Sequence, residues 1–282
     1  MKYGLNELAL ETTRRCNLTC PGYCMRGPSQ KCDLTPEIID TIFANNDISY
    51  IRKICFSGGE PTLNPDIIVY TIDKIIRENI PVYEVVLVTN GQIYSPEIVD
   101  AFNRFNEYRN EKLRISIMKD HKPAADLEPN MQFLSQEEMI KGNTDGHARI
   151  TFSIDEYHAP IKEEVRAAYQ RDAKGLTITD WKPKPEDIYK TGFASDSPVG
   201  KEFTYELDPL RYMNEGNDER FILDTIYMTV NGHWTTEGMG SYVNMDINNC
   251  GHVNDITIKD LIDRLGVDKS FGSKKTDEIK LI

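Results

Sequence analysis

The sequence predicts an α/β fold built on a parallel sheet. Through the first two thirds of the 282-residue chain, short apolar runs of strand length alternate with longer segments in which apolar residues recur at helical spacing. Three of the helical segments carry proline in their first turn, where its missing N–H is not needed. No internal repeat or long linker interrupts the alternation. We therefore expect one large domain with additions rather than several small domains.

The first ninety residues predict three strands separated by two helices. The apolar runs at residues 5–11, 51–57 and 83–89 have the length of strands. Between them, residues 35–45 and 65–79 carry apolar side chains three and four positions apart, which is helical spacing. Strands that are joined by helices are expected to run parallel in one sheet.

The alternation continues beyond the third strand. Residues 95–108 predict a helix whose N-cap is Ser95. Two further strands are predicted at residues 113–118 and 148–154, and they flank a polar segment, residues 119–147, that has the composition of an insertion. The predicted sheet therefore has five strands by residue 154.

The last part of the chain predicts shorter elements. A helix at residues 163–171 and a strand at 176–179 precede a proline-punctuated stretch. Residues 222–237 predict a β-hairpin, because Asn-Gly at 231–232 is a strong turn signal. Residues 255–266 predict a terminal helix that stops at its final glycine.

Composition limits the classes of partner. The chain has 45 acidic and 33 basic residues, and its formal charge of -12 would repel a phosphate backbone, so we expect no nucleic-acid partner. It shows neither a secretory leader nor a stretch of about 20 apolar residues that could span a membrane. We therefore expect a cytoplasmic protein without a membrane partner, whose six cysteines are free or metal-bound.

Half of those cysteines stand together in the segment TTRRCNLTCPGYCMRG. Cys16, Cys20 and Cys24 are four residues apart, but Pro21 and Gly22 oppose a helix that would place them on one face. A loop wrapped around a metal centre is favoured instead, because clustered thiolates bind zinc or an iron–sulphur cluster. Three thiolates without an evident fourth are typical of a cluster that leaves one iron open.

Glycine-rich and polar motifs follow three of the predicted strands. In FSGGEPTLNP, after the second strand, Gly58 and Gly59 allow close backbone approach, and Glu60 can pair with an ammonium group. The third strand ends in VTNG, and the strand predicted at residues 148–154 lies in ARITFSIDEYHA. Because loops at the carboxyl ends of strands build the active sites of barrel folds, these motifs predict a common site.

Together the motifs resemble the radical SAM superfamily, whose usual cluster motif is Cys-x3-Cys-x2-Cys with an aromatic residue before the last cysteine. Here Tyr23 is that aromatic residue, and one more residue separates Cys20 from Cys24 than in the family pattern. The resemblance extends over residues 5–200. It implies a 4Fe-4S cluster on Cys16, Cys20 and Cys24, whose open iron chelates S-adenosylmethionine.

The resemblance also implies a set of cofactor-binding residues. In the family, the Gly-Gly-Glu-Pro signature helps to hold the methionine amino group of S-adenosylmethionine. Polar side chains at the ends of the third and fourth strands hold its ribose and carboxylate. The matching positions in this sequence are Gly58, Gly59, Glu60, Asn90, Ser153 and Asp155.

Fold and chemistry follow from the same resemblance. We expect a partial (β/α)6 TIM-like barrel of parallel strands over residues 1–200, and a small extension over 201–282 that is similar to a degenerate SPASM or twitch segment. One-electron reduction, by a donor such as a flavodoxin or ferredoxin, would cleave S-adenosylmethionine to methionine and a 5'-deoxyadenosyl radical, which abstracts hydrogen from the substrate. Because Cys250 is the only cysteine of the extension, no auxiliary cluster is expected.

Three residues are candidate catalytic groups. Tyr157 and His158 follow the strand predicted at residues 148–154, where substrate is expected. A lone histidine is nonetheless more often a surface or core residue. Cys250 could return a hydrogen atom to a substrate radical, as an epimerase-like reaction requires. The alternative for Cys250 is a small apolar residue that packs the extension against the barrel.

The substrate and two other classes of protein stay open. A peptide, modified or epimerised at carbon, is our first hypothesis because the tail resembles the extensions of peptide-modifying members; a small metabolite is the second. A zinc-stabilised binding protein would use Cys16, Cys20, Cys24 and Cys32 equally as ligands. An electron-transfer iron–sulphur protein would not bind S-adenosylmethionine and would leave the glycine-rich motif unexplained.

Overall fold

The computed structural model describes residues 2–20, 22–44, 48–120, 147–154, 158–202, 210–213, 220–236, 241–247, 249–265 and 267–268. The strands are β1 (Lys2–Thr13), β2 (Ile48–Gly58), β3 (Val82–Thr89), β4 (Ala148–Ser153), β5 (Thr177–Trp181), β6 (Leu210–Met213), β7 (Arg220–Met228), β8 (Trp234–Thr235) and β9 (Val267–Asp268). The helices are α1 (Pro36–Ala44), α2 (Pro65–Glu78), α3 (Pro96–Asp120), α5 (Glu163–Asp172), α6 (Tyr242–Ile247) and α7 (Ile258–Leu265), with 3-10 turns η1 (Pro61–Leu63), η3 (Pro185–Asp187) and η4 (Gly192–Ala194).

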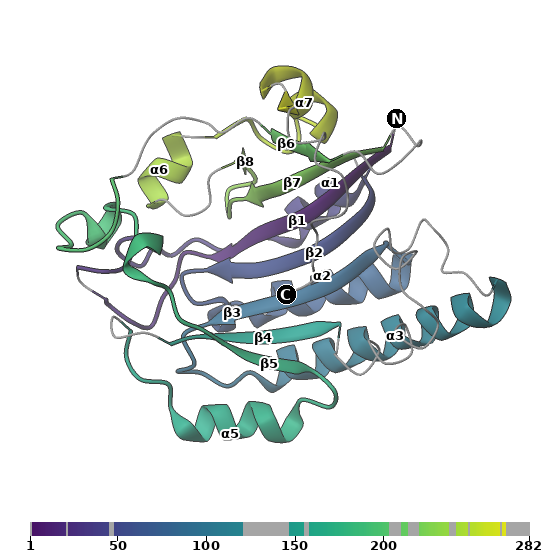
Figure 1. Ribbon diagram of the computed structural model, residues 1–282, viewed down its shortest axis with the longest axis horizontal. Coiled ribbons are helices and arrows are strands. Elements are labelled where there is room, and N and C mark those ends of the chain that lie inside the picture. The colour runs from purple at the N-terminus through teal and green to yellow at the C-terminus, as the bar shows by residue number, and fades with distance from the viewer. Residues whose placement is uncertain are drawn as a thin grey trace.

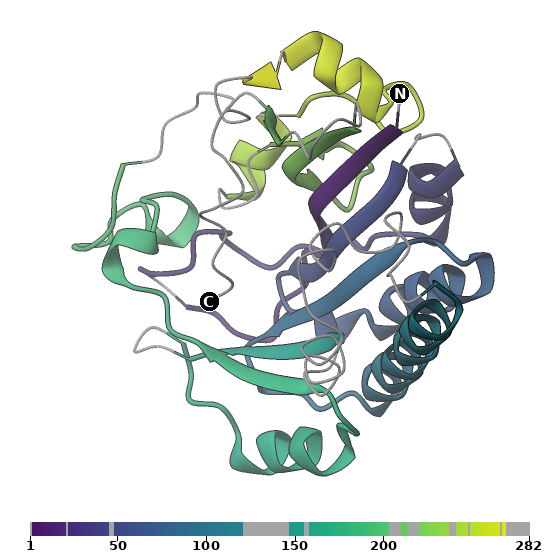
Figure 2. The same cartoon turned by 45° about the vertical axis from the view of Figure 1, so that its right-hand side comes forward.

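A single sheet with the order β5-β4-β3-β2-β1-β7-β6-β9 forms the centre of the fold, and β8 pairs with β7. Six of the described strands, from β5 to β7 in that order, run parallel to one another. The sheet curves, as Figure 2 shows, so the predicted partial parallel barrel is confirmed. Its sixth parallel strand is β7, which pairs with β1 although it lies inside the predicted extension, residues 201–282.

Helices α1, α2 and α3 lie along one face of the sheet, and α5 lies beyond its β5 edge (Figures 1 and 2). Side chains alternate along each strand, so every second residue faces these helices. The residues on that face are buried and apolar, and they pack with the helices into one core: Leu8, Leu10, Ile54, Phe56, Val85, Leu87, Ile150 and Phe152 from the strands, with Ile68, Ile72, Phe102 and Phe105 from α2 and α3. The other face carries a mixture of polar, charged and apolar side chains.

The strand predicted at residues 113–118 is wrong. The structure continues α3 without a break from Pro96 to Asp120. No glycine or proline separates this apolar run from the preceding helix, and the lower helix propensity of its β-branched residues costs only about half a kcal/mol each. Residues 121–146 of the predicted insertion lie outside the described residues. Neither α3 nor any other helix in the described part of the chain is long and apolar enough to cross a membrane.

The predicted hairpin and terminal helix are both present. Strands β7 and β8 pair antiparallel, and Gly232 in the turn between them has φ 77°, which glycine adopts without strain. Helix α7 begins at Ile258 rather than at residue 255, because Thr257 caps it. The Thr257 hydroxyl accepts the N–H of Asp260, whose carboxylate accepts the N–H of Thr257 in return.

His147, immediately before β4, is buried with an unsatisfied ring nitrogen. Its ring packs edge-on against the Tyr83 ring, with 5.2 Å between the ring centroids. Within the described residues its Nε2 has no hydrogen-bond partner. Burial lowers the pKa of His147 to about 4, and the nearby Arg109 guanidinium acts in the same direction. Between pH 6.5 and 4 the unfolded chain therefore takes up a proton that the folded chain does not.

Stability should fall as the pH is lowered through that range, in part because of His147. We expect His147→Phe, which keeps a ring against Tyr83 and cannot be protonated, to lose less stability than the wild type between pH 7 and 4.5. The difference should be about 1–2 kcal/mol, as judged from the pKa shift. Urea unfolding at both pH values measures it, and equal losses in the two proteins would contradict the assignment.

Candidate active site

A cavity of about 700 Å3 opens at the carboxyl ends of the parallel strands. Its volume lies in the range of small-molecule sites. The sheet contributes side chains of the face opposite the helices, taken from all six parallel strands: Glu7, Ala9, Lys53, Cys55, Ser57, Val86, Val88, Arg149, Thr151, Ser153, Thr179, Trp181 and Tyr227. The strand-end loops, η3, η4 and α6 add further residues, and another part of the wall comes from the loop between β1 and α1, residues 14–35, which we call the cysteine loop.

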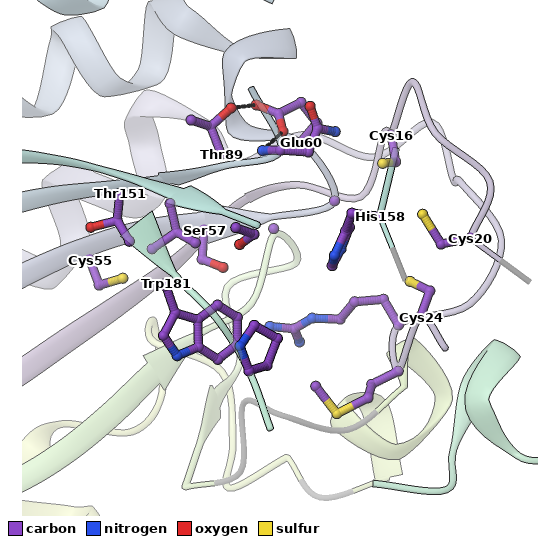
Figure 3. Close-up of a pocket in the computed structure, with 18 of the residues that line it drawn as sticks. Cys16, Cys20, Cys24, Cys55, Ser57, Glu60, Thr89, Thr151, His158 and Trp181 are labelled. Carbon is purple, nitrogen blue, oxygen red and sulfur yellow. Dashed lines mark hydrogen bonds between the residues drawn. The ribbon is translucent and has the colours of Figure 1, made fainter. Parts of the chain in front are cut away.

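The three clustered cysteines all line this cavity. Figure 3 shows Cys16, Cys20 and Cys24 spaced along the cysteine loop on one side of the cavity. The N–H of Cys24 donates to the carbonyl of Cys20 at 3.0 Å, which makes a single turn, and Gly22 in that turn has φ 83°. The N–H of Cys16 donates to the Ser29 hydroxyl at 3.0 Å. The described part of the segment is therefore a wrapped loop, as predicted, and not a helix.

These thiols suit an iron–sulphur cluster. Burial raises the pKa of the Cys16 thiol, and the negative charges of Glu60 and Cys24 contribute to the shift, so a positive metal centre is needed to hold a thiolate there. Among the described residues, no three His, Cys, Asp or Glu side chains converge closely enough to bind one metal ion. Thiols that share a cavity without converging fit a cluster several atoms across better than a single zinc at about 2.3 Å from each sulphur.

Cys32 lies apart from the other three. It packs against the hydrophobic core, its Sγ donates to the Asn231 side-chain oxygen at 3.1 Å, and it is not part of the cavity wall. The four-cysteine zinc site that the sequence left open therefore lacks its fourth ligand in this arrangement.

The two glycines after β2 hold the start of the cysteine loop. The N–H of Gly59 donates to the Thr13 carbonyl and that of Glu60 to the Arg15 carbonyl, both at 2.7 Å. A Cβ at Gly58 would lie 2.3 Å from the Thr13 oxygen, and one at Gly59 would lie 2.2 Å from the Arg15 oxygen. Only glycine allows this contact, so the pair positions the chain just before Cys16 in addition to lining the cavity.

Glu60 is a buried hydrogen-bond acceptor that joins two strand ends. Its Oε1 accepts the N–H and hydroxyl of Thr62 and the hydroxyl of Thr89, and its Oε2 accepts the N–H of Asn90 at 2.8 Å. Figure 3 shows the Thr89 contact. The Asn90 side chain in turn donates to Asn17 at 2.9 Å. A continuous network therefore runs from η1 through β3 to the cysteine loop.

The other predicted site residues divide into three groups. Ser153, 8% exposed, and His158 both line the cavity, and Figure 3 places His158 facing the cysteines. Asp155 and Tyr157 lie outside the described residues. Cys250 is the one that the structure moves away from the site.

Cys250, the candidate hydrogen-atom donor, lies outside the cavity wall. The side chain is 3% exposed, belongs to the hydrophobic core and does not line the cavity. Its N–H donates to the Trp234 carbonyl, and its carbonyl accepts from Arg264. The polar run before Cys250 suggested an exposed loop, but burial in the core makes this residue a small apolar packing group.

Two segments from the second half of the chain cover the outer side of the cysteine loop. The N–H of Ala194 in η4 donates to the Cys24 carbonyl at 3.1 Å, and a Cβ at Gly192 would lie 2.4 Å from the Met25 oxygen. The N–H of Tyr242, at the start of α6, donates to the Arg26 carbonyl at 3.1 Å. No local sequence signal marks η4 as a partner of the cysteines.

A buried arginine fixes α6 in that position. Arg14 is 2% exposed, and its guanidinium makes ion pairs with Glu11 at 3.1 Å and Asp246 at 2.8 Å. It also lies 5.0 Å from the centre of the Tyr242 ring. Sequence analysis missed this cluster because Arg14 and Asp246 are 232 positions apart.

Comparisons with known proteins found a family match that includes the cysteine loop. Residues 10–121 match the model of the Radical SAM superfamily. The probable GTP 3',8-cyclase of Methanosarcina mazei is 33% identical over 91 residues, 30% of this chain and 25% of that protein. The protein of the same name from Pyrococcus horikoshii is 36% identical over 90 residues, 31% of this chain and 27% of its own length. The matches thus span about a quarter of these curated relatives.

The fold has a counterpart among solved structures. The crystal structure of BtrN in complex with AdoMet and 2-DOIA aligns with a TM-score of 0.50 over 93% of this chain and 83% of that chain, at 14% identity. A partial parallel barrel with three cysteines on the loop after its first strand defines the class of protein. Residues 10–121 carry the signature of the radical SAM superfamily. The cofactors of that family are a 4Fe-4S cluster and S-adenosylmethionine.

The Glu60 network predicts a specific loss of stability. In Glu60→Gln the new NH2 group would face the N–H of Asn90 in a fully buried position. Two hydrogen-bond donors would then oppose each other without an acceptor. We expect a loss of about 1–3 kcal/mol in the free energy of unfolding, measured with urea. Glu186→Gln, at an exposed position in η3, is the matched control and should change little. Equal stability of the two variants would show that the network does not hold the strand ends.

Proposed function

We propose that this enzyme reductively cleaves S-adenosylmethionine and abstracts hydrogen from a substrate in the cavity. The observation that carries the proposal is that Cys16, Cys20 and Cys24 line one cavity together with Gly58, Gly59 and Glu60. When bound, a 4Fe-4S cluster and S-adenosylmethionine supply a 5'-deoxyadenosyl radical. Its formation requires an electron donor, such as a flavodoxin or ferredoxin, and a reducing compartment such as the cytoplasm.

The residues of the chain bind and orient in this proposal. The three thiolates hold the cluster. Gly58, Gly59, Glu60, Asn90, Ser153 and Asp155 hold S-adenosylmethionine, and His158 and Tyr157 contact the substrate. The inward face of residues 1–200 forms most of the cavity, and the extension over 201–282 closes one side of it through Tyr242. Apolar wall residues such as Val86 and Val88 help to exclude water from the reacting groups.

For the substrate we propose a peptide that is modified or epimerised at carbon. Support comes from the hairpin and helix after residue 220, which resemble the extensions of peptide-modifying family members. A small metabolite is the second candidate, and the cavity volume of about 700 Å3 favours it.

The cluster assignment predicts unequal effects of the cysteines. After anaerobic reconstitution, the wild type should bind about four irons per chain, and Cys16→Ala, Cys20→Ala and Cys24→Ala should each lose the brown chromophore. Cys32→Ala is the matched control and should keep it, because Cys32 lies outside the cavity. Iron content and visible absorption measure the outcome. Stoichiometric zinc, lost equally from all four variants, would refute the assignment.

The substrate proposal predicts which molecules stimulate turnover. The reconstituted enzyme, with dithionite and S-adenosylmethionine, should form 5'-deoxyadenosine faster with its substrate than without it. We expect stimulation by peptides and transfer of deuterium from a labelled peptide into 5'-deoxyadenosine, measured by mass spectrometry. Stimulation and transfer with metabolites alone would replace the peptide by the second candidate.

A further inference from the structure

Most charged side chains in the cavity wall already have a partner. The ion pairs made by these side chains are Lys53 with Glu7 at 2.5 Å, Arg149 with Glu84 at 3.0 Å and Asp180 with Arg166 at 2.8 Å. Glu60 accepts its four hydrogen bonds, and Asp187 accepts the N–H of Lys184 at 2.9 Å. Each of these charged side chains therefore has an ion-pair or hydrogen-bond partner within the protein.

Arg26 is the exception. It lines the cavity, and no carboxylate of the described residues lies within ion-pair distance of its guanidinium. Among the described residues, its guanidinium makes one hydrogen bond, from Nη1 to the Met245 sulphur at 2.7 Å. A thioether is a weak acceptor, while a guanidinium has five N–H donors in a planar fork. Most of the hydrogen-bonding capacity of this partly buried cation is thus unused.

The side chain of Arg26 is directed into the barrel. Its carbonyl is held from outside by the N–H of Tyr242, and Gly27 follows with φ 105°, a turn that glycine makes without strain. Burial raises the pKa of the Cys55 thiol to about 12, and the Arg26 charge is among the groups that oppose this rise. Arg26 lines the same cavity as Cys55 and Ser57, which Figure 3 labels, so its charge faces the barrel interior.

We propose that Arg26 binds a carboxylate or phosphate group of the molecule converted in this cavity, an inference that rests on the proposed function. A guanidinium matches both oxyanions through two parallel hydrogen bonds. A partly desolvated charge without a partner is unfavourable, and an anion at this position removes that cost. The substrate is therefore an anionic molecule or a peptide that presents a carboxylate.

The carboxylate of S-adenosylmethionine is a second source of the same chemistry. The polar strand-end residues Asn90 and Ser153 are the positions that we assign to the cofactor. Arg26 is instead held by α6, because its Nη1 donates to the Met245 sulphur and its carbonyl accepts the N–H of Tyr242. This separate attachment favours the substrate as the source of the anion.

The first experiment tests the anion site with inorganic phosphate and needs neither cluster nor turnover. Melting temperatures are compared in phosphate and in chloride of equal ionic strength for the wild type, Arg26→Gln, Arg26→Lys and Arg77→Gln. General salting effects act on all four proteins alike. Arg77, exposed on α2 and paired with Glu78, is the matched control.

We expect phosphate to raise the melting temperatures of the wild type and of Arg77→Gln by similar amounts. The increase for Arg26→Gln should be smaller by at least about 2 °C. Arg26→Lys, which keeps the charge without the planar fork, should lie between them. Identical phosphate shifts in all four proteins would overturn the proposal. If Arg26→Gln does not fold, a wild-type response in Arg26→Lys would overturn it equally.

The second experiment distinguishes the two sources of the anion. Calorimetry on reconstituted Arg26→Gln compares S-adenosylmethionine with its decarboxylated analogue. Affinity for S-adenosylmethionine within twofold of the wild type supports the assignment to the substrate. A loss of about tenfold or more that is absent for the analogue would overturn that assignment and give the anion site to the cofactor. The phosphate test needs no iron. Failure of cluster assembly would therefore contradict the proposed function and leave the result of the phosphate test unchanged.

Discussion

The active site depends on backbone contact between the ends of two neighbouring strands. The loop after β2 approaches the chain before Cys16 so closely that Gly59 and Glu60 donate to carbonyl groups there. This approach is possible only without side chains at Gly58 and Gly59. Glu60 extends the contact to β3 by accepting four buried hydrogen bonds. The cysteine loop therefore begins from a rigid base, although the loop itself has no regular secondary structure in its described part.

Distant parts of the chain stabilise the outer side of the same loop. Glycine at 192 lets η4 approach Met25 closely, and the Arg14 ion pairs attach α6. A loop that must present three thiols in one arrangement needs support on both sides, because each unsupported residue would retain conformational freedom. The extension thus contributes directly to the site, and its hairpin strand β7 is also part of the central sheet.

The sequence was sufficient for the features that have local causes. Periodicity located the parallel strands and most helices, and motif order brought Cys16, Gly58 and Asn90 to one edge of the sheet. Sequence-based prediction failed where contacts between distant residues determine the structure. Residues 113–118 have the composition of a strand but continue a helix, and Cys250 sits in a polar segment but packs in the core. Arg14 pairs with Asp246 and Arg26 donates to Met245, and both partners lie more than 200 positions away in the sequence. No local pattern encodes such contacts.

The order of the strands also has consequences for folding. β1 pairs with β2 on one side and with β7, from residue 220 onward, on the other. During synthesis, therefore, one edge of β1 has no partner strand until most of the chain has left the ribosome. An unpaired strand edge is prone to association with other chains, and pairings between distant segments form slowly. Synthesis of residues 220–228 is therefore the step that removes this exposed edge from the nascent chain.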